Sequence, residues 1–430
     1  MAAGPDGVAG PTRLERAFRE EWGAVVATLA RRLGDLQAAE DAAAEAFAAA
    51  AAAWARDGVP PNPGGWLTVT AWRKAVDAYR AGGAQTASVD PQLLGGMSAA
   101  GSAAGHDADP ADGLEEPAMT ETLGDDRLGL IFACCHPALA EEVRVALTLR
   151  FVAGLTTREI AAAFVVPEAT LAQRLVRAKR KIRESGIRFT VPPQHRLAER
   201  LRSVRAVVYL VFNEGFASGG DGELIRRDLC DEAIWLGRLL CRLFPADAET
   251  AGLLALMLLH QSRAAARVAA DGRPVPLAEQ DRSRWDAALV SEGVAVLDQA
   301  LTRHSPGPYQ LQAAIAALHG TAGSFESTDW AQIALLYGSL ARLDPSPVVE
   351  VNRAVAVGMA DGGLAGLAVL APVVSAGTLD QYGPLHAAHG FLLEKAGYPE
   401  RARGAWARAA ESAGNAAVRD ELLRRHGDPL

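Results

Sequence analysis

This sequence predicts an all-α fold, on the basis of three observations. Half of the 430 residues are hydrophobic but only 6% are aromatic, and alanine and leucine are plentiful, a composition typical of helical globular proteins. Apolar residues recur every three or four positions along several segments. Glycine- and proline-rich stretches separate these segments. The chain is too long for a single core, so about three domains are expected.

Three helices are expected in the first domain, residues 12–80. The first is amphipathic, because apolar residues step by three or four: Leu14, Phe18, Trp22, Val25, Leu29 and Leu33. The second, over about residues 36–55, is nearly all alanine and carries three carboxylates: Glu40, Asp41 and Glu45. A loop rich in proline and glycine, residues 59–65, precedes the third helix over about 66–80. That helix is expected to turn these side chains away from the core: Thr68, Trp72, Arg73, Asp77 and Arg80.

A flexible acidic linker is expected at residues 81–124. This stretch contains no lysine, arginine or aromatic residue but has seven Asp and Glu, among many Gly, Ala and Ser. Such a segment buries too little apolar surface to offset the entropy lost on ordering. It would therefore tether two folded parts.

A helix-turn-helix is predicted in the next domain, residues 125–188. Thr156 and Glu159 form a capping box that begins one helix, and Pro167 begins the second. Four apolar side chains of the second helix should face a core: Leu171, Leu175, Ala178 and Ile182. Its other side carries residues that hydrogen-bond phosphates or base edges: Thr170, Gln173, Arg174, Arg177, Lys179, Arg180, Lys181 and Arg183.

The distribution of charge favours DNA contact by this domain. Residues 125–188 hold eleven Lys and Arg against seven Asp and Glu, a net charge of +4, whereas the whole chain is at −8. Basic side chains neutralise phosphates and release counterions. The local excess of positive charge therefore indicates DNA contact, although the net charge of the whole chain is negative. A solvated helix face would show the same charge run, but the capping box, turn and apolar stripe together favour DNA.

A separate all-helical domain is expected over residues 189–430. Segments 354–370 and 389–405 share a pattern of helix, glycine break and helix, 35 residues apart. This spacing is typical of tetratricopeptide-like helix pairs stacked into a solenoid. A run of ordinary helical hairpins would have a similar pattern.

No motif indicates an enzyme, a cofactor, a metal site or a membrane segment. The four cysteines lack the spacing of zinc ligands and are expected to be reduced thiols: Cys134, Cys135, Cys230 and Cys241. Cys134 and Cys135 are expected to be buried in a core helix that Pro137 ends. Phosphate-binding glycine motifs and Ser/His/Asp signatures are not found. Neither a signal peptide nor a bilayer-spanning stretch is recognisable, so a cytoplasmic protein is expected.

The order of these parts resembles that of extracytoplasmic-function sigma factors of the sigma-70 family. Residues 38–47 are similar to the acidic region 2.2, 62–80 to regions 2.3 and 2.4, and 156–183 to region 4.2. Four segments look like the subgroup with a long tetratricopeptide-like C-terminal extension: 134–137, 209–215, 281–286 and 309–313. The chain departs from the family at Ala38 and Ala44, where polar residues are frequent, and after Arg80, where basic residues commonly continue.

The resemblance implies a non-enzymatic sigma factor that binds core RNA polymerase, through its β′ clamp helices and β flap, and promoter DNA. The clamp helices would meet Glu40, Asp41 and Glu45. The −10 element would be held by Asn62, Trp72, Arg73, Lys74 and Arg80. The −35 element would be read by Thr170, Gln173, Arg174 and Arg177, with Lys179, Arg180, Lys181 and Arg183 on phosphates. The C-terminal extension would regulate in cis, or receive a protein or ligand.

Two other interpretations stay open. A stand-alone helix-turn-helix regulator with a sensing domain would leave the acidic helix and residues 62–80 unexplained. An all-helical enzyme in residues 192–430 would depend on scattered polar residues: Asn213, Glu214, His260 and Trp285. For Trp72 taken alone, burial against a neighbouring helix fits as well as base stacking.

Overall fold

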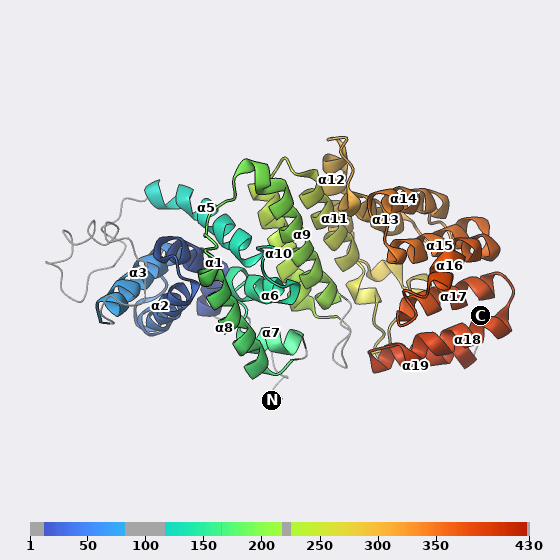
Figure 1. Cartoon of the computed structure of the whole chain (residues 1–430), viewed down its shortest axis with the longest axis horizontal. Coiled ribbons are helices and arrows are strands. Elements are labelled where there is room, and N and C mark those ends of the chain that lie inside the picture. Colours follow the sequence, from blue (N-terminus) through green and yellow to red (C-terminus); the bar gives the residue numbers. More distant parts are fainter. Residues whose placement is uncertain (1–12, 82–116, 165, 217–224, 428–430) are drawn as a thin grey trace, which may run out of the picture. The chain divides into compact units, whose positions relative to one another are not determined.

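A computed structural model describes residues 13–81, 117–164, 166–216 and 225–427 (Figure 1). These residues form helices and loops, with one isolated bridge between Val268 and Pro274, which confirms the all-α prediction. The chain divides into two compact units, Met1–Val207 and Val208–Leu430. Helix α9 (Gln194–Phe216) crosses this division, so the second unit begins later than the expected boundary at residue 189. None of the described helices has the length and hydropathy of a bilayer-spanning segment.

Two groups of helices precede α9 in the first unit. The first group comprises α1 (Arg13–Leu33), α2 (Leu36–Asp57) and α3 (Pro63–Ala81). The second comprises α5 (Pro117–Cys134), α6 (Glu141–Leu147), the π-helical turn η1 (Thr148–Val152), α7 (Thr157–Ala163) and α8 (Glu168–Glu184). Because α5 begins at Pro117, residues 117–124 are helical, not part of a linker as expected. The rest of that linker from residue 82 lies outside the described residues.

Helix α1 joins the two groups, because it packs on α2 and α3 as well as on α5 and η1. Its predicted apolar stripe is buried at Trp22, Val25, Leu29 and Leu33. The α1 backbone also approaches η1 closely: a Cβ atom added at Gly23 would lie 2.5 Å from the carbonyl oxygen of Val152. Glycine at this position therefore lets the two groups form one packed unit.

The second unit continues as a series of helices, each packed on the next. They are α10 (Arg227–Leu243), α11 (Ala248–Gln261), α12 (Ala287–Leu301), α13 (Pro308–Thr321), α14 (Trp330–Leu343), α15 (Pro347–Asp361), α16 (Gly363–Ala376), α17 (Gly383–Lys395), α18 (Pro399–Glu411) and α19 (Ala416–Gly427). Three short 3-10 turns lie between α11 and α12: η2 (Ala264–Ala266), η3 (Leu277–Glu279) and η4 (Arg282–Arg284).

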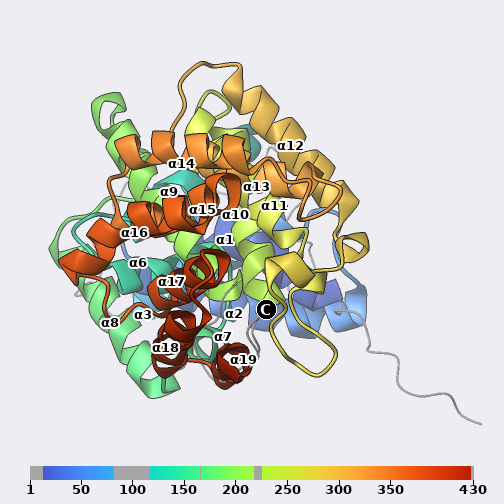
Figure 2. The same cartoon turned by 90° about the vertical axis from the view of Figure 1, so that its right-hand side faces the viewer.

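The predicted glycine breaks separate paired helices in the C-terminal part of this unit. Gly362 lies between α15 and α16 with φ +99°, and Gly397 lies between α17 and α18 with φ +83°. Positive φ is accessible to glycine at little cost, which is why the chain can reverse there. Each helix then packs on its pair, and α16 packs on α17 (Figure 2). The helix, glycine, helix pattern is thus confirmed.

Candidate nucleic-acid and polymerase interface

The helix-turn-helix forms as the sequence predicts. The backbone nitrogen of Thr156 donates to the Glu159 carboxylate at 2.7 Å, and the Glu159 nitrogen donates to the Thr156 hydroxyl at 3.2 Å, which completes the capping box. Pro167 is the N-cap residue of α8. The apolar side of α8 is buried at all four predicted positions: Leu171, Leu175, Ala178 and Ile182. These contacts fix which face of α8 is turned outward.

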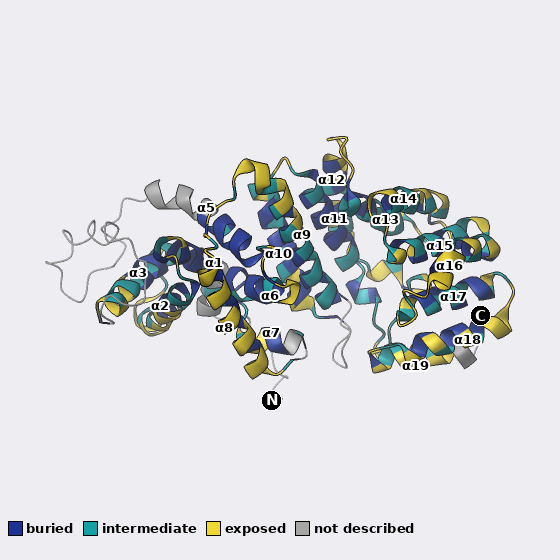
Figure 3. Cartoon of the chain, in the orientation of Figure 1, coloured by how far each residue is buried: buried dark blue, intermediate teal, exposed yellow. Residues whose placement is uncertain are grey.

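The outward face of α8 is exposed over its whole length (Figure 3). Seven of the eight predicted DNA contacts have exposed side chains: Thr170, Gln173, Arg174, Arg177, Arg180, Lys181 and Arg183. Two of them have partners, since Arg180 lies 3.6 Å from Glu184 and Arg183 lies 3.4 Å from Asp35. The Arg180–Glu184 pair is exposed on both sides and contributes little. Asp35 is only 15% exposed, but the Arg183 side chain is 60% exposed, so both arginines stay accessible to phosphates.

Val176 is a further candidate DNA contact that the sequence patterns did not predict. Its side chain is 60% exposed on the outward face of α8, between Gln173 and Arg177. A signal was present, because Val176 is out of register with the apolar stripe of the same helix. A methyl-bearing side chain among polar ones is suited to contact the methyl group of thymine.

Lys179 differs from its neighbours. Its side chain is only 12% exposed, and its ammonium group donates to Glu40 at 2.8 Å. Lys179 therefore does not share the exposed face of α8 with the other basic residues, and its contact with a phosphate stays a prediction. The reason is the first group of helices, which supplies a carboxylate to this side of α8.

Glu40 is the centre of this contact. Arg150 donates to one Glu40 oxygen from Nε at 2.8 Å and from Nη2 at 2.6 Å, while Lys179 binds the other oxygen. The Arg150 guanidinium also lies 5.1 Å from the centre of the Trp22 ring, and the Trp22 indole nitrogen donates to the Arg150 carbonyl at 3.1 Å. Two cations thus neutralise one carboxylate that is 13% exposed.

The three predicted polymerase-binding carboxylates do not share one face. Glu40 points toward Arg150 and Lys179, whereas Asp41 and Glu45 are exposed on α2. The spacing explains this result, because positions four apart share a helix face and adjacent positions do not. Glu45 lies 3.7 Å from Lys74, a loose and exposed pair.

The candidates for the −10 element are divided between surface and core. Asn62, Arg73, Lys74 and Arg80 are exposed. The Asn62 side chain accepts a hydrogen bond from the Gly65 nitrogen at 2.9 Å, so it caps the start of α3. The expectation that Trp72 faces outward, together with Thr68, is wrong: Trp72 is 5% exposed and Thr68 is 4% exposed. The Arg32 guanidinium lies 5.5 Å from the centre of the Trp72 ring.

The cysteine thiols of the first unit are buried, as predicted. Cys134 ends α5 and Cys135 follows it, and burial raises the pKa of Cys135 to about 11. The Cys135 sulfur lies 3.4 Å from the Thr148 hydroxyl, a buried polar contact. A thiol with a raised pKa is a poor nucleophile and a poor metal ligand. Within the described residues, no three His, Cys, Asp or Glu side chains are grouped as metal ligands.

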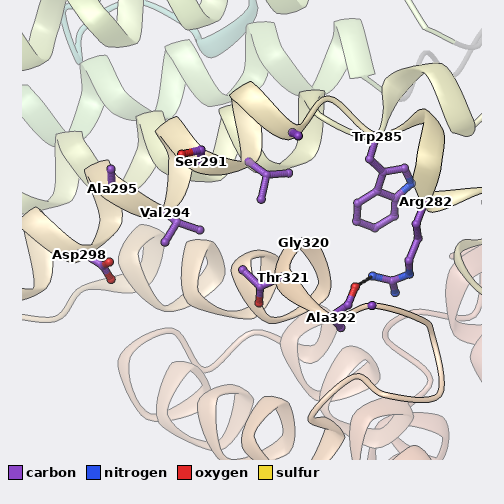
Figure 4. A pocket seen from close by; sticks show the side chains of 12 residues that line it. Arg282, Trp285, Ser291, Val294, Ala295, Asp298, Gly320, Thr321 and Ala322 are labelled. Atoms are coloured by element: carbon purple, nitrogen blue, oxygen red, sulfur yellow. Dashed lines mark hydrogen bonds between the residues drawn. The ribbon is translucent and has the colours of Figure 1, made fainter.

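The polar residues of the enzyme interpretation lie in different surroundings. His260 packs against the Phe212 and Phe216 rings, and burial lowers its pKa well below the usual value. Trp285 instead lines a groove of about 610 Å³ along α12, where Arg282 lies over its ring (Figure 4). Arg282 donates to the Ala322 carbonyl at 2.9 Å, so it caps the C-terminus of α13.

Comparisons with known proteins agree with this geometry. Sigma-70 region 2 matches residues 18–84, and sigma-70 region 4 matches residues 130–182. A family of unknown function, DUF6596, matches residues 200–301. The two groups of helices in the first unit are thus the two conserved regions of a sigma factor.

Two relatives place the chain more closely. A probable ECF RNA polymerase sigma factor, SigI of Mycobacterium tuberculosis, is 34% identical over 172 residues, which are 40% of this chain and 54% of SigI. An uncharacterized protein of Rhizobium meliloti is 44% identical over 388 residues, which are 90% of this chain and 89% of that protein. No solved structure matches the chain. The chain belongs to the extracytoplasmic-function sigma factors of the sigma-70 family and carries a helical C-terminal extension.

Proposed function

We propose that this sigma factor binds core RNA polymerase and directs it to promoters whose −35 element is read by α8. The observation that supports the proposal most is the outward face of α8, held in place by the buried stripe on its other side. A helix presenting such side chains fits the major groove. The base-reading residues would be Thr170, Gln173, Arg174, Val176 and Arg177, with Arg180, Lys181 and Arg183 on phosphates.

The first group of helices would supply the remaining contacts. Asp41 and Glu45 are exposed and would complement arginine-rich clamp helices of the β′ subunit, while region 4 would meet the β flap. The −10 element would meet the exposed side chains Asn62, Arg73, Lys74 and Arg80. Trp72 is buried, so it would have to move to the surface before it could stack on a base.

The Glu40–Lys179 ion pair sets a condition on this function. Glu40 belongs to the proposed polymerase surface and Lys179 to the proposed DNA surface. The ion pair between them engages both side chains. Both groups become available only if region 2 and region 4 separate. We therefore propose that polymerase binding selects an open state in which this pair is broken, because a ligand shifts an equilibrium by its differential affinity for the two states.

The C-terminal extension is proposed to regulate transcription in cis. The proposal is motivated by the size of the second unit, which covers Val208–Leu430. Ending the chain after Phe216 keeps α9 whole and removes the rest of that unit. If the extension is regulatory, the shortened chain with core polymerase should give a changed level of promoter-driven transcription. An unchanged level would refute the role.

Run-off transcription tests the main proposal. Core RNA polymerase is incubated with a promoter library, with and without this chain, and the transcripts are sequenced. The proposal predicts defined start sites that depend on the chain. Binding to DNA without comigration with core polymerase, and no new start sites, would instead favour a stand-alone regulator.

A further inference from the structure

A second cavity in the second unit encloses about 480 Å³. One wall is the turn between α11 and α12, where Val268 pairs with Pro274. The other is formed by the start of α17, the end of α18 and the start of α19, and its residues are mostly small or apolar: Gly383, Pro384, Ala387, Ala409, Ser412, Ala413, Gly414, Val418 and Leu422. Cavities of this size hold small organic molecules.

The walls are held together by specific contacts. The Ala269 nitrogen donates to the Arg273 carbonyl at 2.9 Å, and the Val275 nitrogen donates to the Arg267 carbonyl at 2.7 Å, which fixes the turn. The Arg273 guanidinium lies 3.3 Å from Glu421, so the turn is tied to α19. The cavity is therefore part of the folded unit.

Arg267 is the charged residue among those that line this cavity. Its guanidinium lies 3.8 Å from the centre of the Phe216 ring, and Nη1 donates to the Phe216 carbonyl. In the described part of the chain, neither its Nε nor its Nη2 has a hydrogen-bond partner, and no carboxylate lies within ion-pair distance. Burial lowers the pKa of Arg267 to about 10.

A second guanidinium adds to the positive potential. Arg263 lies 5.5 Å from the centre of the same Phe216 ring, and burial together with the charge of Arg267 lowers the pKa of Arg263 to about 9. A partly buried cation without a counter-ion destabilises a fold. Among the described residues none supplies a carboxylate to Arg267, so an anion in this cavity would compensate its charge.

The residues that line the cavity limit the chemical class of ligand that it can bind. The Nε and Nη2 groups of Arg267 form one side of a planar fork that matches a single carboxylate. A phosphate dianion would bury additional negative charge against apolar walls. We propose that this cavity binds a small monocarboxylate with an aromatic or aliphatic body, which Arg267 pairs and the small side chains enclose. This site is independent of the proposed transcription function.

Calorimetric titration of the full chain with 2-naphthoate tests the proposal, with 2-naphthamide as the uncharged ligand of the same shape. The acid should bind at least tenfold more tightly than the amide, which corresponds to about 1.4 kcal/mol. Equal affinities, or no binding of the acid at millimolar concentration, would overturn the proposal. This comparison needs no substitution.

Variants then locate the site. Arg267→Met should weaken acid binding at least tenfold and leave the amide unchanged, whereas Val418→Trp should fill the cavity and abolish both. Arg284→Met, an exposed arginine of the same unit, should change neither. The Val418→Trp variant retains Arg267, so it tests the site even if the Arg267→Met variant does not fold. Undiminished binding to a folded Val418→Trp variant would place the ligand elsewhere. None of these readouts depends on transcription.

Discussion

Replacing Arg150 by methionine tests whether the Glu40 contact holds region 2 against region 4. The change removes two charge-assisted hydrogen bonds to Glu40, a bond from Nη1 to the Leu155 carbonyl at 3.1 Å, and a cation beside the Trp22 ring. Arg150 is 16% exposed and Glu40 is 13% exposed. The pair thus lies between exposed pairs, worth about 0–1 kcal/mol, and fully buried ones, whose disruption costs about 3–5 kcal/mol.

Because Lys179 still binds Glu40 in this variant, we expect a loss of about 2 kcal/mol in the free energy of unfolding. Urea denaturation followed by tryptophan fluorescence measures it. If the pair opposes polymerase binding, the same 2 kcal/mol raises the affinity for core polymerase by up to roughly 30-fold. Fluorescence anisotropy of the labelled chain with core polymerase measures that change.

Arg158→Met serves as the matched control, since Arg158 is exposed on α7. It should leave both the free energy of unfolding and the polymerase affinity unchanged. A destabilised Arg150→Met variant whose affinity for core polymerase stays at the wild-type level, or falls, would refute the reasoning.

Three further predictions concern separate parts of the chain. Arg174→Ala should weaken binding of the holoenzyme to its promoter by about 1–3 kcal/mol if Arg174 reads a base; an equal loss on scrambled DNA would assign it to the backbone. Gly23→Ala should lower the melting temperature, because the new Cβ would lie 2.5 Å from the Val152 oxygen; an unchanged melting temperature would show that α1 and η1 are not packed so closely. Burial lowers the pKa of His319 to about 4, so the unfolded chain binds more protons than the folded one between about pH 6.5 and 4, and stability should fall as the pH drops through that range. His319→Phe should flatten this dependence, and a variant as pH-sensitive as wild type would assign it to other groups.

Periodicity and capping were sufficient to predict the helix-turn-helix. Thr156 and Glu159 are three residues apart in the chain, so their interaction is local and visible in the sequence. The stripe from Leu171 to Ile182 needs only helical geometry. The exposed face of α8 follows directly, because it is the side opposite the stripe.

The errors concern residues that contact a second surface. Lys179 and Glu40 are 139 positions apart, and nothing within either helix indicates that they meet. The periodicity of its own helix places Trp72 outward, but α3 packs on both α1 and α2, which buries more than one stripe. Tertiary packing therefore decided the residues that sequence patterns placed wrongly: between the two groups of helices for Lys179, and among the three helices of one group for Trp72.

DNase footprinting on a promoter identified by run-off transcription tests the central claim most directly. With core polymerase and this chain together, protection should cover both the −35 and the −10 elements, and Arg174→Ala should lose the −35 part first. Protection of the −35 element by the chain alone, equally strong without core polymerase, would contradict the account.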